Sequence, residues 1–138
     1  MIDTSRPIAA GKNTYCGPYV LAGIMWCDTD EAARRVRAVC GLRAVRGLSA
    51  RRLVQTLNAN GYQVTHAYPH MHDAIGYTLR TWKETHPTGV YVVLVSGHFT
   101  LFANGRFTES LVHGVWVTDP PRPKRRVKGA WRIARCDT

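Results

Sequence analysis

Cys16 stands at the junction between a polar loop and an apolar stretch, a position where a thiol can become reactive. Asn13 and Thr14 precede it as candidate N-cap residues, and Pro18 fits the first turn of a helix. Free backbone N–H groups and the positive end of the helix dipole lower a thiol pKa, and the thiolate is the nucleophile. The alternative is that Cys16 packs as a small buried apolar residue. A partner histidine is needed to decide between these interpretations.

His98 is the second residue of chemical interest, because it opens an apolar strand next to a strong turn signal. The strand spans 98–103, and Asn104-Gly105 favours a two-residue hairpin turn before a returning strand over 106–111. Counting back from that turn sets His98 opposite Leu111. The pattern therefore predicts a histidine at the open end of a hairpin, where it can face a helix packed on the sheet.

Glu109 lies two residues before Leu111 and therefore on the same face of the returning strand. That position is diagonal to His98 and within cross-strand reach, so the carboxylate can hold one imidazole tautomer and stabilise its cation. Taken singly, His98 is also explained as a half-buried strand residue and Glu109 as a solvated one. Together with Cys16, they predict a nucleophile, a base and an orienting acid.

The two motifs also resemble those of papain-like cysteine peptidases, in particular the short type that processes bacteriocin leaders. Residues 16–22 are similar to the cysteine-glycine-proline start of the nucleophile helix in that family. Residues 97–102, followed by Asn104-Gly105, resemble the family's glycine-histidine strand and hairpin. The resemblance covers residues 13–119 in order and spacing. Small proteins of this build with a basic C-terminal end also resemble ones carried by tailed bacteriophages.

The resemblance implies roles for individual residues. Cys16 would be the nucleophile of a papain-like cysteine hydrolase that cleaves a peptide, isopeptide or amide bond, and His98 would be its general base. The family places the orienting acid in an Asp-Pro pair, which Asp119-Pro120 matches, whereas the hairpin register favours Glu109. Both candidate acids stay open at this point.

The expected oxyanion hole departs from the family's pattern. Papain-like enzymes carry a glutamine six residues before the cysteine, where this chain has Ala10. Asn13 is the nearest amide that could replace it, together with the Cys16 backbone N–H. The departure keeps a second hypothesis open, in which a catalytically weak or inactive papain-like domain binds nucleic acid or a host protein through its basic residues. A third hypothesis is a virion component.

The elements that must position these residues follow an order of helices first and strands second. Capping signals and helical periodicity predict four helices: one over 15–26, one from a Thr29 or Asp30 cap to Gly41, one from a Ser49 cap to Gly61, and one after an Asp73 cap. Strand patterns cover 62–68, 90–95, 98–103, 106–111, 115–118 and 130–134. This order predicts an α+β fold. The family resemblance implies its papain-like form, with N-terminal helices packed on a C-terminal antiparallel sheet.

Length and composition indicate one globular domain over residues 1–138. Its helical part would span about 13–86, its sheet part about 90–135, and a basic segment 122–128. With 45% apolar and 20% charged residues, the composition is typical of a folded chain and excludes a disordered one.

The chain is strongly basic, with a formal net charge of +10. No acid occurs from Ala32 to His72, a stretch that contains seven arginines: Arg34, Arg35, Arg37, Arg43, Arg46, Arg51 and Arg52. With the basic segment 122–128, this imbalance favours contact with nucleic acid or another polyanion. Solvated helix faces and a mobile tail explain the same residues. The candidate partners are therefore a peptide or protein substrate and nucleic acid.

The remaining signals concern metals and location. The four cysteines form no C-x-x-C pair, and we expect free thiols at Cys16, Cys27, Cys40 and Cys136. No third ligand accompanies His70 and His72, so we expect a surface loop there and assign neither a metal nor a cofactor. No apolar run approaches the ~20 residues of a membrane span, and the N-terminal residues lack a signal-peptide pattern. We therefore expect no membrane contact and a cytoplasmic protein, in a bacterial host if the chain is phage-encoded, with the virion as the alternative.

Overall fold

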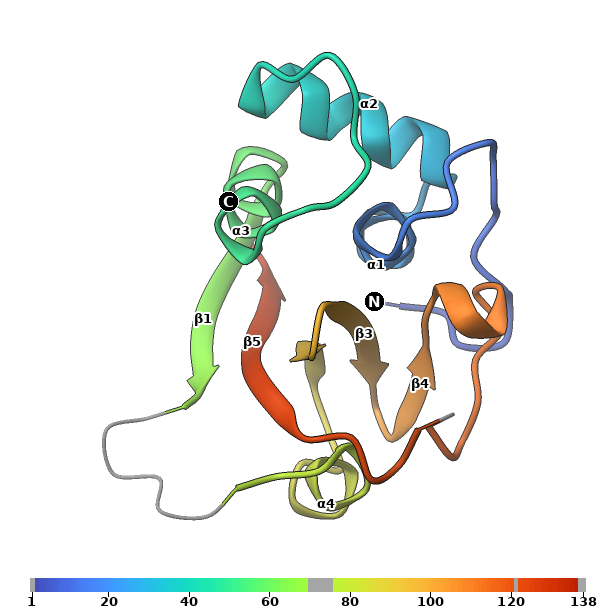
Figure 1. Ribbon diagram of the computed structural model, residues 1–138, viewed down its shortest axis with the longest axis vertical. Coiled ribbons are helices and arrows are strands. Elements are labelled where there is room, and N and C mark those ends of the chain that lie inside the picture. The colour runs from blue at the N-terminus through green and yellow to red at the C-terminus, as the bar shows by residue number, and fades with distance from the viewer. Residues whose placement is uncertain (1, 70–75, 121, 137–138) are drawn as a thin grey trace.

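The computed structural model describes residues 2–69, 76–120 and 122–136, and they form an α+β fold. Its helices are α1 (Cys16–Met25), α2 (Thr29–Cys40), α3 (Ala50–Ala59), α4 (Leu79–Thr85) and the 3-10 helix η1 (Ser110–Val112). Its strands are β1 (Tyr62–Tyr68), β2 (Val90–Val95), β3 (His98–Ala103), β4 (Arg106–Thr108) and β5 (Val127–Arg135). The strands pair antiparallel in one sheet, so the predicted α+β class is confirmed (Figure 1).

The sheet has the strand order β1-β5-β2-β3-β4, so the last strand in the sequence lies between two earlier ones. β5 pairs with β1 on one side and with β2 on the other, and near its start Val127 lies opposite Val95. β2 and β3 form a hairpin in which the same Val95 lies opposite His98. The start of β5, the end of β2 and the start of β3 therefore lie at one end of the sheet.

α1 is buried on all sides, because it lies between α2 and the sheet (Figure 1). Every residue from Gly17 to Met25 is buried, as expected for a helix that is apolar all round. Gly23 permits a close approach to the sheet, since a Cβ there would lie 2.6 Å from Leu101 Cδ2 and 2.8 Å from Ile8 Cδ1. This packing fixes the start of α1 relative to β3.

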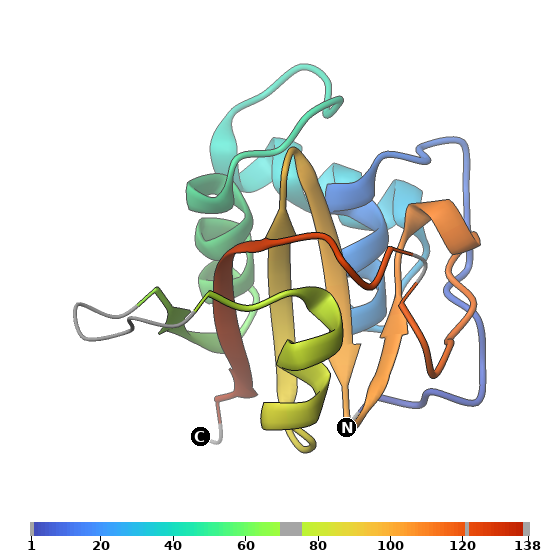
Figure 2. The same cartoon turned by 60° about the horizontal axis from the view of Figure 1, so that its bottom comes forward.

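The two faces of the sheet carry separate cores. Alternation along β2 sends Val92 toward the layer of α1–α3, and Val93 and Val95 toward the opposite face. α4 covers that opposite face and buries Leu79 and Trp82 against it (Figure 2). The domain therefore has three layers. The candidate dyad, Cys16 and His98, lies where the helix layer meets one end of the sheet.

The start of α2 differs from the prediction of a Thr29 or Asp30 cap. The cap is Asp28, whose carboxylate accepts the Glu31 N–H at 2.7 Å. Thr29 and Asp30 lie in the first turn instead, and their side chains accept N–H groups of the segment 11–13. The sequence offered three adjacent capping residues, and the tertiary contact with this segment selects among them.

The other helix starts show one confirmed cap and two corrections. Ser49 caps α3 as predicted, accepting the Arg52 N–H at 3.2 Å. The cap of α4 is Thr78, which forms a reciprocal capping box with Thr81, so α4 begins later than a cap at Asp73 would require. α1 has Tyr15 as its N-cap without a side-chain bond.

β1, β2 and β3 have the predicted bounds, whereas the strand predicted over 106–111 ends at Thr108. The chain turns into η1 after Thr108, and the segment that follows η1 is bonded to the N-terminal lead-in segment, which lies outside the sheet. Gly114, which follows η1, has a positive φ, and its carbonyl oxygen accepts the Ile8 N–H at 2.9 Å. A Cβ at Gly114 would lie 2.8 Å from Ile8 Cβ, so the contact requires glycine. The lead-in segment, far away in the sequence, thus shortens the strand.

The last two predicted strands also differ from the structure. The segment 115–118 forms a single bridge, between Phe107 and Val117, instead of a strand. The strand predicted over 130–134 is longer and includes two residues of the basic segment, Val127 and Lys128. It reaches this length because β5 has a partner on both sides.

Some predictions fall on residues outside the described part of the chain. The loop predicted at His70 and His72 is such a case, and so is the Asp73 side chain itself, whose predicted cap is replaced by Thr78. Within the part that is described, no helix combines the length and the apolar character needed to cross a membrane.

The hairpin turn sets the register of β3 and β4, and it requires positive φ at Asn104 (49°) and Gly105 (84°). We expect Gly105→Ala to lower the free energy of unfolding by about 1–2 kcal/mol, because a Cβ strains the left-handed conformation. Urea denaturation measures the change. Gly47→Ala is the matched control, since a Cβ there would meet nothing within 4 Å; its effect should stay within about 0.5 kcal/mol. Equal losses in the two variants would contradict this account of the turn.

Candidate active site

Cys16 is the first residue of α1, and its side chain is half-buried. The next residue, Gly17, packs closely under the loop before α3, since a Cβ there would lie 2.8 Å from the Leu48 side chain. The first N–H groups of a helix have no intrahelical partner, and that of Gly17 hydrogen-bonds the Cys16 sulfur. The predicted position of Cys16 at a helix start is confirmed.

The segment before Cys16 is held against the start of α2. The Gly11 N–H donates to Thr29 Oγ1 at 2.8 Å. The N–H groups of the next two residues donate to the two oxygens of Asp30 at 2.9 and 2.8 Å, and they hold the pKa of that carboxyl below its usual value. These bonds fix the path of the chain into α1.

Asn13, the candidate oxyanion donor, braces this segment in the structure. Its Oδ1 accepts the Tyr15 N–H at 3.1 Å, and its Nδ2 donates to the Val45 carbonyl oxygen at 3.0 Å. Neither Asn13 nor Thr14 caps α1, because the Asn13 oxygen bonds the N-cap residue itself. Since Nδ2 carries two hydrogens, one of them stays available for another acceptor. Ala10, at the family's glutamine position, is exposed and offers no side-chain donor.

His98 and Glu109 lie in contact, as the hairpin register predicts. His98 Nε2 is 2.9 Å from Glu109 Oε2, and the Glu109 side chain is only 3% exposed. The ring N–H does not point at this oxygen closely enough for a hydrogen bond, so the contact is an ion pair that a ring rotation would align. Such misalignment is common in active sites before a substrate binds. Because Nε2 faces the carboxylate, we infer that Nδ1 is the ring nitrogen that meets Cys16.

Thr100 belongs to this group, although the sequence reasoning missed it. Its buried hydroxyl donates to Glu109 Oε2 at 2.7 Å. The predicted hairpin register already contained this contact, because the pairing that places His98 opposite Leu111 also places Thr100 opposite Glu109. The pairing of His98 with Leu111 is wrong, since β4 ends at Thr108. Glu109 follows directly after this strand end and bonds the hydroxyl through its side chain.

The contact between Cys16 and His98 changes the pKa of both groups. Burial raises the pKa of the Cys16 thiol, but hydrogen bonds from the His98 ring and the Phe99 N–H outweigh burial and lower it below 9.0. The hydrogen bond with Cys16 and the contact with Glu109 raise the pKa of His98 to about 9, against the effect of burial. Both shifts favour transfer of the proton from the thiol to the imidazole, which is the direction that a thiolate–imidazolium pair requires.

Asp119, the alternative orienting acid, lies apart from this pair. It is exposed and lines a hollow with Lys83 and Glu84 of α4, on the opposite face of the sheet from α1. Lys83 Nζ donates to the carbonyl oxygen of the preceding Thr118 at 2.6 Å, which ties the segment to α4. The geometry therefore favours Glu109 as the acid that orients His98.

The other cysteines lie away from the dyad, and all four thiols are free. Cys27 follows the far end of α1, where burial raises its pKa. Cys40 ends α2, and its sulfur lies 3.8 Å from Thr56 Oγ1. Cys136 is exposed after β5. Across the described residues, no cluster of three or more histidine, cysteine or acidic side chains could hold a metal ion.

The site is thus assembled from the start of α1, the start of β3 and the end of β4. Neither a family model, nor a curated protein, nor a solved structure matches this chain. The arrangement of Cys16, His98, Glu109 and Thr100 is therefore the basis for a functional assignment.

The first prediction concerns thiol reactivity. Iodoacetamide at about pH 6 should modify Cys16 faster than Cys27 or Cys136, because only a thiolate reacts and an ordinary thiol is protonated at that pH. Peptide mapping by mass spectrometry after short exposures measures the three rates in one protein. A Cys16 rate no higher than that of Cys27 or Cys136 would show that the nucleophile is not activated.

The second prediction concerns the His98 titration, followed by NMR. We expect a midpoint near 9 in the parent protein. It should fall in both Cys16→Ala and Glu109→Gln, and more in Cys16→Ala because the Cys16 contact is the larger cause. A parent midpoint near the ordinary 6.5 would contradict the assignment.

The same raised pKa has a consequence for stability. The protonated ring stabilises the fold fully below pH 6.5, and this contribution is lost as the pH rises through about 9. The lowered pKa of Cys16 contributes in the opposite sense as the pH rises toward 9.0, so the comparison is made without this thiol. The free energy of unfolding of Cys16→Ala should decline from pH 6.5 upward relative to the double variant Cys16→Ala/His98→Gln. Parallel curves for the two proteins would contradict the expected linkage.

Proposed function

We propose that this chain is a cysteine hydrolase that cleaves a peptide, isopeptide or amide bond through Cys16, His98 and Glu109. The observation that carries the proposal is the contact of one imidazole with a helix-start thiol on one side and a buried carboxylate on the other. A nucleophile, its base and the group that orients the base are the minimum that acyl transfer by a thiol requires.

Acylation starts from the thiolate. Cys16 Sγ attacks the carbonyl carbon of the scissile bond, and the π electrons of that carbonyl move onto its oxygen. The tetrahedral intermediate collapses, the carbon–nitrogen bond breaks, and the leaving nitrogen takes the proton of the His98 imidazolium. The products of this half-reaction are a Cys16 thioester, a free amine and a neutral His98.

Deacylation returns the site to its starting state. Neutral His98 accepts a proton from a water molecule, whose oxygen attacks the thioester carbon. The carbon–sulfur bond breaks, the acid product leaves, and the Cys16 thiolate again faces an imidazolium. Glu109 stabilises the cation at both stages and holds the ring in one orientation, while Thr100 fixes Glu109.

The negative charge that develops on the carbonyl oxygen needs donors. The Cys16 backbone N–H is one, because it lies in the first turn of α1 at the positive end of the helix dipole. The second Nδ2 hydrogen of Asn13 is the other candidate, since the Val45 bond uses only one hydrogen and holds the amide in place. These two donors would replace the glutamine that papain-like enzymes carry at the position of Ala10.

We further propose that the domain is a papain-like fold of the short leader-processing type, encoded by a bacteriophage. Support comes from a nucleophile helix packed on an antiparallel sheet and from the chain order of cysteine, histidine strand and hairpin acid. The placement of the acid at Glu109 departs from the Asp-Pro position of that type, which Asp119 occupies in sequence.

A comparison of two acids tests this mechanism with p-nitrophenyl acetate as the acyl donor. Glu109→Gln should slow acetylation of Cys16 by about 10-fold or more near neutral pH, because without the carboxylate His98 holds its proton less tightly and a smaller fraction of Cys16 is thiolate. Asp119→Asn removes the same charge at the exposed site and should leave the rate unchanged. Release of nitrophenolate gives the rate, and intact mass confirms the acetyl group.

Two controls separate a catalytic from a structural effect. Cys16→Ala should abolish the acetyl adduct, and Cys27→Ala should retain it. In Glu109→Gln, the alkaline pH at which activity declines should also shift to a lower value, because His98 then loses its proton at lower pH. A Glu109→Gln protein with parent rate and pH profile, or an inactive Asp119→Asn protein, would sink the assignment of the acid.

A further inference from the structure

The loop between α2 and α3, residues 41–49, lies directly beside the nucleophile. Its Val45 carbonyl oxygen accepts the Asn13 amide at 3.0 Å, and its Leu48 side chain packs over Gly17, the residue after Cys16. Any chain that places a carbonyl carbon at the Cys16 sulfur must therefore pass close to this loop.

The loop and the start of α3 carry exposed cations without acidic partners. Arg43 and Arg46 flank the buried Val45, and Arg51 and Arg52 lie in the first turn of α3. Within the described residues, no carboxylate lies within ion-pair distance of any of these four arginines. We call Arg43, Arg46, Arg51 and Arg52 the loop arginines.

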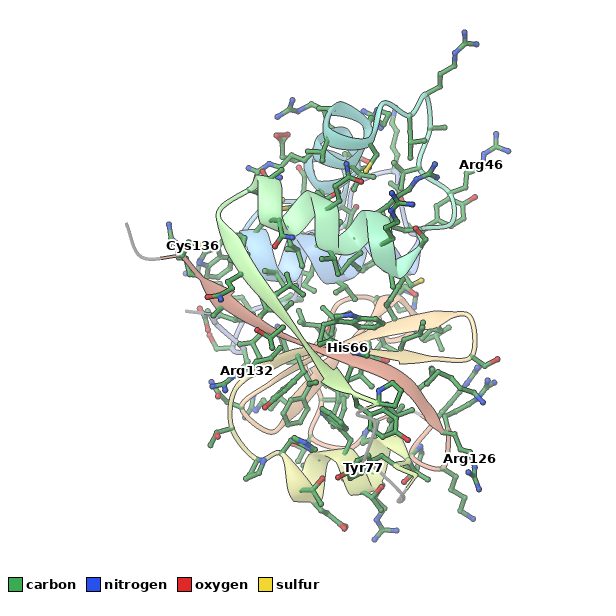
Figure 3. All side chains as sticks on the ribbon, turned by 90° about the vertical axis from the view of Figure 1, so that its left-hand side faces the viewer. Arg46, His66, Tyr77, Arg126, Arg132 and Cys136 are labelled. Atoms are coloured by element: carbon green, nitrogen blue, oxygen red, sulfur yellow. The ribbon has the colours of Figure 1, made fainter. Side chains whose placement is uncertain are left out.

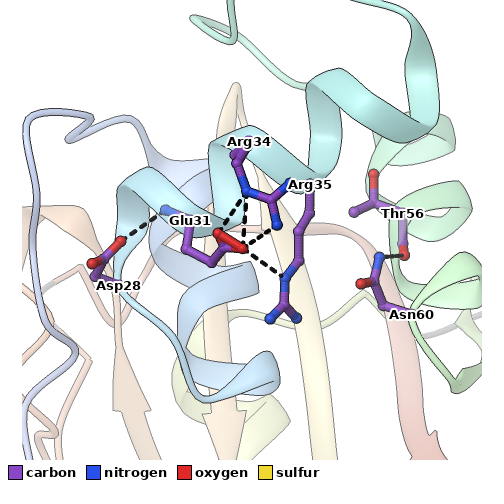
Figure 4. A network of polar contacts seen from close by, with 6 residues as sticks. All are labelled: Asp28, Glu31, Arg34, Arg35, Thr56 and Asn60. Carbon is purple, nitrogen blue, oxygen red and sulfur yellow. Dashed lines mark hydrogen bonds and ion pairs between the residues drawn. The ribbon is translucent and has the colours of Figure 1, made fainter.

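Two neighbouring arginines on α2 differ from the loop arginines because their charge is compensated. Arg34 and Arg35 both pair with Glu31 on the outer side of α2 (Figure 4). Arg37, half-buried in the last turn of α2, has no ion pair within the described residues, so the uncompensated charge continues from the end of α2 into the loop 41–49 and the start of α3.

A second group of cations reaches the same end of the molecule from the other face of the sheet. The segment 122–126 precedes β5, and Val127 pairs with Val95, which also pairs with His98. Its four exposed cations are Arg122, Lys124, Arg125 and Arg126. Figure 3 shows Arg46 and Arg126 on the same side of the molecule, whereas Arg132 lies on the opposite side. Two stretches about 80 residues apart in sequence thus flank the dyad.

We infer that the substrate of the dyad is an acidic peptide segment, with carboxylates on the residues that flank the bond to be cleaved. The loop arginines would contact one flank and the segment 122–126 the other. The inference rests on the proposed hydrolase function, and it adds the substrate class that the catalytic residues do not define. Charge of one sign around a site attracts a substrate of the opposite sign and orients it.

A peptide is favoured over nucleic acid for two reasons. A thiolate–imidazolium pair attacks acyl carbons, and the cations lie on the loop that packs beside Cys16 and on the segment that enters the sheet opposite Val95, the partner of His98. In addition, single-stranded nucleic acid needs exposed aromatic rings between the cations. Among the exposed large apolar residues of the described part of the chain, two are aromatic: Tyr15, which precedes Cys16, and Trp26, which follows the far end of α1.

The experiment measures the rate at which three peptide vinyl sulfones label Cys16 of the full chain. The probes share length and warhead and carry glutamate, glutamine or lysine at the flanking positions. The glutamate probe should label at least about 10-fold faster than the glutamine probe at low salt, and the lysine probe should be slowest. The advantage should shrink as salt rises, because exposed charges are screened.

Arginine-to-glutamate variants identify which cations contact the peptide probe. Arg43→Glu/Arg46→Glu and Arg125→Glu/Arg126→Glu should each remove most of the preference for the glutamate probe. Arg132→Glu/Arg135→Glu is the matched control, because it changes net charge equally at exposed positions near the far end of β5, and it should retain the preference. Each variant keeps Cys16, His98 and Glu109, so iodoacetamide should still label Cys16 in all of them, and each probe rate is divided by the iodoacetamide rate of the same variant.

The outcomes distinguish this inference from the function on which it rests. Equal labelling by the three probes, together with fast iodoacetamide labelling, would overturn the acidic substrate and leave the hydrolase intact. Slow labelling by every reagent would overturn both. If a single-stranded oligonucleotide blocks labelling at lower concentration than a glutamate peptide of equal charge, the cations belong to a nucleic-acid site and the inference fails.

Discussion

The contact between the buried Glu109 carboxylate and His98 is the constraint on which the candidate site depends. A carboxylate removed from water needs hydrogen bonds and an opposite charge, and Thr100 and His98 supply them. Removing one member of a buried ion pair costs about 3–5 kcal/mol, so the pair favours a protonated imidazole. The imidazolium then stabilises a thiolate at Cys16. The charge on a buried residue thus contributes, through His98, to the state of the candidate nucleophile.

The fold holds these groups on rigid elements that come from distant parts of the sequence. α1 is fixed between α2 and the sheet, and the segment before Cys16 is bonded to the start of α2. β3 is a buried strand with neighbours on both sides, and the Asn104-Gly105 turn sets which residue of the returning chain reaches His98. The loop arginines and the cations of the segment 122–126 lie around this frame. In the proposed function, the buried elements would hold the catalytic groups and the exposed cations would select the substrate.

Local signals predicted much of this arrangement. The Asn-Gly turn and the alternating strands were sufficient to bring Glu109 to His98, and the apolar run after Cys16 predicted a buried helix. Non-local contacts explain the errors. The lead-in segment shortens β4 through Gly114, so extrapolating the register to Leu111 failed. No local pattern could reveal that β5 inserts between β1 and β2 or that the loop 41–49 lies beside Cys16.

The central claim is that Cys16 is a thiolate in the resting protein because His98 and Glu109 hold a positive charge next to it. Thiolates absorb ultraviolet light more strongly than thiols, so a pH titration of the absorbance difference between the parent and Cys16→Ser reports this residue alone. The account predicts a midpoint below the ordinary 9.0, and a rise of that midpoint in Glu109→Gln. A parent midpoint at or above 9.0 would contradict it.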